Sequence, residues 1–250
     1  MCYTKAYNRS NTKKPGKQSG IQQHQEVTYV MKKSIALMLG IGVVILFLTA
    51  CSGEAQTFTP EEYTADAATI RRISIDVHDR EIDVFSTPDN QICLSYSQSA
   101  QEEYNVVSDG DMLTMTAADS KDWVDYIGVK PDISNRKIAL TVPQELLSVL
   151  EVCTTNENIT LSQLAVRDKV QLVSEGGNIE FADLDVGQAI SLSAKNGNIA
   201  GNILGSSGDF TIRTDIKKGN CNLPKDEAAG SKTLDVCCNN GDVDIAFEEE

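Results

Sequence analysis

Few residues of this sequence could perform acid–base or nucleophilic chemistry. After residue 50 the only histidine is His78, in the turn-like stretch Val77–Arg80. A cluster of histidine ligands for a metal ion is therefore ruled out, because it needs at least a second imidazole. A Ser-His-Asp triad around His78 would need a serine in a glycine-bracketed elbow, and no serine has that pattern. We interpret His78 as a solvated turn residue, and we expect no catalytic residue, no metal site and no cofactor.

The cysteines that follow Cys51 do not have the C-x-x-C spacing typical of zinc or thioredoxin-like redox sites. They are Cys93, Cys153, Cys221, Cys237 and Cys238. The alternation of the surrounding apolar residues predicts that Cys221 and Cys238 face a core, whereas Cys153 and Cys237 face outward. We interpret Cys221 as core filling. A disulfide between Cys221 and Cys238 is the alternative.

Residues 31–51 have the layout of a secretory signal peptide that ends in a cysteine. Two lysines follow a methionine, and the uncharged run Ile35–Leu48 is shorter than the roughly 18 residues that a permanent membrane-spanning helix needs. The end of the segment resembles the lipobox of bacterial lipoproteins: Leu48, Thr49, Ala50 and Cys51. This resemblance implies cleavage before Cys51 and a lipid on its thiol. We therefore expect residues 31–50 to be a signal peptide and Cys51 to anchor the protein on the extracytoplasmic face of a cell membrane. An uncleaved anchor helix is the alternative.

The segments on either side of this signal are polar. Residues 1–30 have no hydrophobic period, and we interpret them as an untranslated or disordered extension. Gln25–Val27 can be encoded by codons that contain a ribosome-binding sequence ahead of Met31, which favours the untranslated alternative over a genuine cytoplasmic tail. Residues 51–69 are small and polar, which predicts a lipidated tether between the membrane and the fold.

The charge of the chain excludes one large class of partners. The formal net charge is -14, and residues 1–50 are basic, so the part after Cys51 is more acidic still. Binding to nucleic acid relies on Lys and Arg replacing counterions along the phosphate backbone. We therefore expect no nucleic-acid partner.

Apolar residues alternate with polar ones from Ile70 onward, which predicts short β-strands joined by tight turns. Asp109-Gly110 lies between apolar runs and indicates a hairpin, and Ile138–Pro143 reads as a strand that ends in proline. We expect an all-β domain over residues 70–247.

A repeated phrase makes residues 150–247 the clearest part of this domain. It consists of a turn containing Gly-Asn or Gly-Asp followed by an apolar residue, with steps of 20, 20, 22 and 22 residues. The copies are Glu157-Asn158-Ile159, Gly177-Asn178-Ile179, Gly197-Asn198-Ile199, Gly219-Asn220-Cys221 and Gly241-Asp242-Val243. Such a period holds strands and bends but no pair of helices, so it predicts a β-solenoid or stacked β-strand repeat of about 20 residues per copy. We expect Gly177 and Gly197 to have positive φ at this bend.

The Asn and Asp residues of the repeat form a column that could have a role of its own. Aligned carboxylates can bind calcium, but four of the five members are amides, and the calcium-binding nonapeptide pattern is absent. We therefore predict a ladder of side-chain hydrogen bonds along the stack.

The only tryptophan lies in the acidic stretch Asp122–Ile127. Aromatic residues dominate contact sites, so Trp123, Asp125 and Tyr126 are a candidate binding loop for an envelope protein or a glycan. Our first interpretation of this stretch is that it covers the open end of a strand stack, and the binding loop is the alternative.

Taken together, the strand ending in Val142-Pro143, the segment after the lipobox and the Gly-Asn/Asp-Ile phrase make this chain resemble the bacterial putative-adhesin family of β-strand-repeat proteins, a domain of unknown function. The resemblance covers about residues 70–247 and implies a β-solenoid and an envelope location, without implying a reaction. We expect a non-catalytic adhesin-like binding or structural protein. The alternative is a glycan-cleaving lyase or hydrolase on a β-helix, which would need a pair of acids or a basic residue in a cleft.

Overall fold

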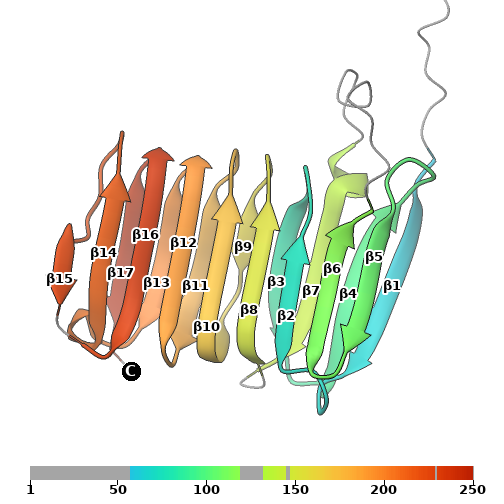
Figure 1. Ribbon diagram of the computed structural model, residues 1–250, viewed down its shortest axis with the longest axis horizontal. Coiled ribbons are helices and arrows are strands. Elements are labelled where there is room, and N and C mark those ends of the chain that lie inside the picture. Colours follow the sequence, from blue (N-terminus) through green and yellow to red (C-terminus); the bar gives the residue numbers. More distant parts are fainter. Residues whose placement is uncertain (1–56, 119–131, 145–146, 229, 250) are drawn as a thin grey trace, which may run out of the picture. The chain divides into compact units, whose positions relative to one another are not determined.

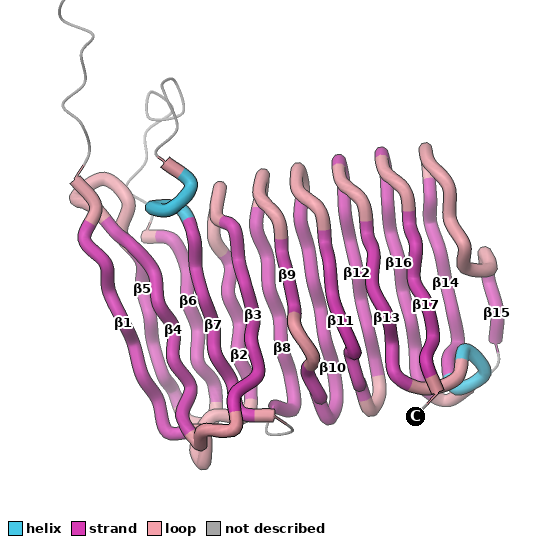
Figure 2. The backbone as a smooth tube through the Cα atoms, turned by 180° about the vertical axis from the view of Figure 1, so that it is seen from behind, coloured by secondary structure: helices cyan, strands magenta, loops and turns pink. Residues whose placement is uncertain are grey.

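The computed structural model describes residues 57–118, 132–144, 147–228 and 230–249. The described residues form seventeen strands that are joined by hydrogen bonds into one sheet. The sheet folds into two facing ladders (Figures 1 and 2). Apolar side chains fill the space between them. Among the described residues no helix has the length and apolar character needed to cross a membrane.

Ladder one is built mostly from parallel neighbours, as expected when each turn of the chain lies on the next. Its strands, in spatial order, are β5 (Tyr104–Asp109), β6 (Met112–Ala117), β2 (Arg72–Asp76), β8 (Leu147–Thr154), β10 (Leu164–Ser174), β12 (Ala189–Asn196), β16 (Lys232–Asn240), β14 (Phe210–Ile216) and β15 (Asp226–Ala228). Only the end strands β5 and β15 run antiparallel to their neighbours.

Ladder two is also built mostly from parallel neighbours. Its strands, in spatial order, are β1 (Thr59–Asp66), β4 (Gln91–Gln98), β7 (Lys137–Pro143), β3 (Glu81–Thr87), β9 (Ile159–Leu161), β11 (Ile179–Val186), β13 (Ile199–Leu204) and β17 (Val243–Glu248). The exception is β4, which runs antiparallel to both of its neighbours, β1 and β7. Two short 3-10 helices, η2 (Ile133–Arg136) and η3 (Ser207–Asp209), precede β7 and β14. The all-β expectation is confirmed, as are the hairpin at Gly110 and the strand that ends at Pro143.

The alternation of the sequence becomes the inside and outside of the stack. Ile73, Ile75, Ile82 and Val84 are all at most 1% exposed and belong to the core. Burying each such side chain contributes about 1.5–3 kcal/mol, so the core is the main source of stability. One turn of the chain cannot bury its apolar face alone, because its cover comes from the turns above and below it.

The order of strands in space differs from the order along the chain at both ends of the stack. The β2–β3 turn lies between β6–β7 and β8–β9, and β16–β17 lies beside β12–β13, ahead of β14. The repeat spacing suggests sequential stacking, but spacing alone does not encode which neighbour a strand chooses. At each end of the stack, the chain leaves the place of one layer empty, and a segment that comes later in the sequence occupies it.

Two further expectations are corrected. Residues 51–69 are not all tether, because Thr59–Asp66 is strand β1, paired with β4. As an edge strand, β1 needs only Tyr63 and Ala65 against the core, and so its sequence lacks a strong apolar pattern. Gly177 and Gly197 do not have positive φ, which among glycines of the described residues is found at Gly110, Gly205 and Gly219.

Candidate functional site

The turns from ladder one to ladder two place one residue per layer in a column, called here the turn column. From the register of the strands, its order is Arg136, Arg80, Glu157, Gly177, Gly197, Gly241 and Gly219. The column is therefore charged in the layers of β7, β3 and β9 and bare of side chains in the other layers. This boundary defines the candidate site.

The glycines of the turn column are required by close approach between layers. A Cβ on Gly177 would lie 2.2 Å from the carbonyl oxygen of Glu157, and one on Gly197 would lie 2.1 Å from that of Gly177. Gly241 and Gly219 would make the same clash, at 2.1 and 2.0 Å. Real Cβ atoms do not approach so closely, so the lack of a side chain lets neighbouring turns lie in contact.

The Asn column beside it is a hydrogen-bond ladder, as the sequence predicts. The Oδ1 of Asn158 accepts from the backbone N–H of Asn178 at 2.8 Å, and Asn178 does the same for Asn198 at 2.9 Å. The ladder then passes to Asp242 at 2.9 Å and from Asp242 to Asn220 at 2.7 Å. Each side chain supplies an acceptor to the next turn, so these residues are occupied in the structure of the stack.

A row of hydroxyl and thiol groups fixes the same turns from inside. The Oγ1 of Thr154 donates to the carbonyl of Arg80 at 2.8 Å, and the Oγ of Ser174 donates to the carbonyl of Glu157 at 3.0 Å. Cys238 occupies the same position, and its thiol donates to the carbonyl oxygens of Gly241 and Gly197 at 3.4 and 3.5 Å. Burial is the first cause that raises the pKa of the Cys238 thiol, which keeps it protonated and able to donate.

The five described cysteines are free thiols. The predicted phase is confirmed, because Cys238 is buried and Cys221 packs against the core, whereas Cys153 and Cys237 are half-buried on the outer face. The disulfide alternative is not realised in this structure. Burial raises the pKa of the Cys153 thiol, with help from nearby acids, which lowers its reactivity.

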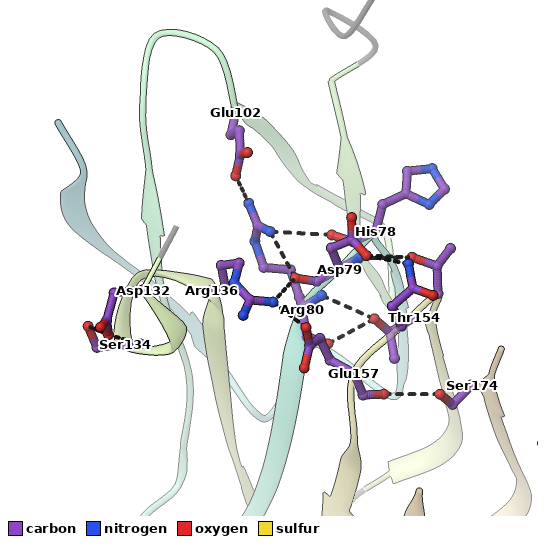
Figure 3. A network of polar contacts seen from close by, with 12 residues as sticks. His78, Asp79, Arg80, Glu102, Asp132, Ser134, Arg136, Thr154, Glu157 and Ser174 are labelled. Carbon is purple, nitrogen blue, oxygen red and sulfur yellow. Dashed lines mark hydrogen bonds and ion pairs between the residues drawn. The ribbon is translucent and has the colours of Figure 1, made fainter. Parts of the chain in front are cut away.

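The charged end of the turn column forms a cluster of two buried arginines with two carboxylates (Figure 3). Arg80 is 2% exposed and makes an ion pair with Glu102, from the segment between β4 and β5. Arg136, at the end of η2, is 9% exposed and makes an ion pair with Glu157 two layers away. Arg80 also donates to the carbonyl of Asp79 at 2.9 Å. Long side chains therefore link the layers of β7, β3 and β9. In the other layers, glycines let neighbouring turns lie in direct contact.

Aromatic and polar neighbours complete this cluster. The Arg80 guanidinium lies 5.6 Å from the centre of the Tyr104 ring, and burial raises the pKa of the Tyr104 hydroxyl although Arg80 opposes the shift. Asp79 has φ 54° and accepts a hydrogen bond from the Asn156 amide. The ion pairs occupy the charges of both arginines, so the described residues of the cluster form a clamp between strands.

His78 takes no part in the ion pairs. Its imidazole is exposed and directed away from the Arg80 guanidinium in Figure 3, and its backbone carbonyl accepts from Arg80 at 3.4 Å. Among the described residues, no group of three or more His, Cys, Asp or Glu side chains is arranged to hold a metal ion. The lipobox residues Leu48 to Cys51 and the loop residues Trp123, Asp125 and Tyr126 lie outside the described residues.

Sequence reasoning missed Arg80, Glu102 and Arg136 as a cluster. One signal was available, namely Glu157 in place of glycine in the first copy of the repeat. The structure explains this substitution, because Glu157 is the partner of Arg136. The partners could not be paired from sequence, since Glu102 and Arg136 come from segments outside the repeat.

A second polar feature lies on the outer face of ladder two. A shallow groove of about 420 Å³ is lined by residues of β1, β4 and β7, including Glu62, Ser95, Tyr96 and Lys137. Lys137 also forms ion pairs with Asp83 and Glu81. Its hydrogen bond to Asp83, and then the one to Glu81, raise the pKa of its ammonium group. Burial, and then Glu61, raises the pKa of the Tyr96 hydroxyl.

Comparison with known proteins agrees with this architecture. The chain is similar to a "putative cell adhesion protein" of Clostridium sporogenes, with a TM-score of 0.54, 8% identity, and coverage of 77% of this chain and 100% of that chain. It is also matched to a "putative adhesin" of Bacteroides fragilis, with a TM-score of 0.35, 13% identity, and coverage of 78% of this chain and 98% of that chain. At such identities the first likeness shows the fold, and the second carries no argument.

Comparison with curated proteins gives no significant match. The family model described as Toastrack DUF4097 matches residues 70–202, which is more than half of the chain. This range contains the charged part of the turn column and the first repeat copies. The chain therefore belongs to the Toastrack DUF4097 family.

Proposed function

We propose that this protein is an extracytoplasmic lipoprotein, anchored through Cys51, that acts as a non-catalytic adhesin-like binding or structural component of the cell envelope. The proposal is supported by the bonding of the polar side chains in the stack. Those at the repeated positions make hydrogen bonds between turns, and the buried charges near Glu157 are paired with one another. What is left for contact with other molecules is the outer surface.

The arrangement of the ladders supports a binding role. Strands that lie side by side in register hold an outer face rigid over many turns, and a rigid face loses little entropy on binding. Adjacent strands on the outside of ladder one carry opposite charges that pair, as in Lys169 with Glu151 at 2.9 Å and Arg213 with Asp235 at 3.4 Å. Such pairs keep the face ordered and polar. They contribute little stability, because they are exposed.

The anchor is tested by replacing Cys51 with alanine in cells. Because the thiol is the only attachment chemistry proposed, Cys51→Ala should abolish labelling by a lipid precursor and release the protein from membranes during a carbonate wash. Cys93→Ala, which removes a thiol within β4, is the matched control and should leave both readouts unchanged. Retention of Cys51→Ala on washed membranes would instead support an uncleaved anchor helix.

The binding role is tested by single changes in the living cell. Trp123→Ala is expected to reduce capture of an envelope component, since aromatic residues supply most contact energy at such sites. His78→Ala is expected to have no effect, because its side chain is exposed and outside the ion-pair cluster. If His78→Ala abolished the protein's cellular phenotype while the variant still folded and captured the envelope component, the result would favour catalysis and contradict the proposal.

A further inference from the structure

The two ladders end in four edge strands, and three of these edges are protected in recognisable ways. β1 carries Pro60, Glu61 and Glu62 near its start, and β15 has only three residues, two of them acidic. The edge of β17 is bonded by Asn222, whose backbone N–H donates to Val243 at 3.2 Å and whose side chain accepts from the Ile245 N–H at 3.1 Å. Proline, charge, shortness and cover are the devices that stop an edge from pairing with another chain.

The edge of β5 has no proline, is not unusually short and is not covered by any described residue, and its carboxylates, Glu103 and Asp109, lie only at its two ends. Its central residues Asn105–Ser108 carry no charge and no proline, and Val107 is 55% exposed, the highest value among the exposed large hydrophobic residues. Among the described strands, β5 is the end strand of ladder one and pairs with β6 alone (Figure 1). Within the part of the chain that the structure describes, one side of β5 is therefore unpaired.

The register shows which backbone groups of β5 are unpaired. Ala118 N–H donates to the carbonyl of Glu103 at 2.9 Å, and antiparallel bonds to β6 then recur at every second residue, at Asn105, Val107 and Asp109. The N–H and C=O groups of Tyr104, Val106 and Ser108 point the other way. No residue in the described part of the chain bonds to them.

We propose that the β5 edge binds an extended segment of a partner polypeptide as an additional strand. Backbone bonds to Tyr104, Val106 and Ser108 hold the segment. Tyr104 and Val106 also pack partly against the core, so the partner's inward side chains rest on apolar surface. The inference names the kind of partner and rests on the binding role proposed above.

The side chains of β5 specify the charge of this partner. The outward row reads Glu103, Asn105, Val107 and Asp109, which is an apolar residue between two carboxylates, all of them exposed. The fitting segment has an apolar or small polar centre and a Lys or Arg at each end. A second copy of this chain fits badly, because a two-fold pairing centred on Val106 places Glu103 opposite Asp109, and like charges directly opposite are destabilising.

The test uses the full-length protein and a synthetic peptide, Lys-Val-Thr-Val-Val-Thr-Lys, blocked at both ends. Binding is followed by amide chemical shifts of the protein. Ser108→Pro removes an N–H at the open edge and no bond to β6, and it should weaken binding at least about tenfold. The matched control Ser108→Thr keeps that N–H and should bind within about twofold of the unchanged protein. A peptide with glutamate at both ends should bind about tenfold more weakly at low salt.

A second measurement does not depend on the folding of a variant. Two peptides are N-methylated on alternate residues, so that each has one edge blocked. Binding by only one of them supports strand addition, because only one edge of the peptide can face β5. Equal binding by both, or unchanged binding by folded Ser108→Pro, would overturn the inference. Membrane retention and envelope capture that persist in Ser108→Pro cells would leave the proposed function standing while this site fails.

Discussion

The two parts of the turn column solve the same packing problem by opposite means. At Gly177, Gly197 and Gly241 the layers touch through bare backbone, with no room for a Cβ. At Arg136, Arg80 and Glu157 the side chains leave the column and form buried ion pairs. In the glycine part, any larger residue would clash with the neighbouring layer. In the charged part, stability depends on each charged residue keeping its partner. The fold therefore fixes where the turns lie. The residue type at each turn then determines whether neighbouring layers meet by backbone contact or are joined by an ion pair.

The largest effect is expected where a buried charge loses its partner. Glu102→Ala leaves the Arg80 guanidinium, whose side chain is 3% exposed, without the carboxylate that it contacts. Breaking a buried pair from one side typically costs about 3–5 kcal/mol, and we expect that loss in the free energy of unfolding measured with urea. The double variant Arg80→Met with Glu102→Leu should recover part of it. A single variant as stable as the unchanged protein would mean that the charged part of the column does not hold its layers together.

The next effect concerns the glycine part. Gly197→Ala places a methyl group against the Gly177 carbonyl and should destabilise the protein by about 1–3 kcal/mol, as overpacking does. Gly110 supplies the control, because its φ is +58° and nothing lies within 4 Å of a Cβ there. Gly110→Asn should be mild, since Asn tolerates this conformation, whereas Gly197→Asn should be at least as costly as Gly197→Ala. Similar thermal shifts for the two Asn variants would contradict the steric account.

A smaller effect is expected in the hydrogen-bond ladder. Asn198→Ala removes the acceptor of the Asp242 N–H and should cost about 1 kcal/mol, the usual net contribution of one hydrogen bond. Asn198→Asp should recover only part of this loss, because a carboxylate can also accept, as Asp242 does for Asn220, but here it would lie directly opposite Asp242 in the next layer. Urea unfolding of both variants measures the difference. An Asn198→Asp variant as unstable as Asn198→Ala would show that the amide itself is needed.

The smallest effect involves Lys137, which lies beside the charged part of the column. Its pKa is raised by Asp83 and Glu81, so its contribution is complete below the ordinary value of 10.5 and is lost as the pH rises through the folded-state pKa. Lys137→Gln should cost less than about 1 kcal/mol at neutral pH, because the ammonium group is partly exposed. The stability difference from the unchanged protein should shrink above pH 10.5, as measured by unfolding at several pH values. A difference that is constant with pH would exclude the ion pair as its source.

Much of the fold follows from local patterns in the sequence. Alternation at Ile73 and Ile75 marks the core, and the Asn column predicts its own ladder, because each of these features depends on residues close together in the chain. The sequence predicts correctly that glycines lie at the turns, but the predicted reason, positive φ, is wrong for Gly177 and Gly197. They are needed because a Cβ would clash with the neighbouring layer, and the backbone preference of a single residue does not reveal such a clash. The pairs Arg80–Glu102 and Arg136–Glu157 depend on which layers become neighbours, and that order is non-local.

The continuous outer face and the charged cluster both depend on the order of the layers. Asn196 pairs with Asn240 of β16 in the register, whereas stacking in chain order would place Asn196 beside Lys218. The direct measurement is disulfide formation in two variants that share Cys237→Ser: Asn196→Cys with Asn240→Cys, and Asn196→Cys with Lys218→Cys. Strands side by side bring Cα atoms within disulfide range, whereas strands two layers apart do not. With β12 beside β16, the 196–240 pair should oxidise rapidly and completely and the 196–218 pair very little. The reverse result would show that the layers stack in chain order.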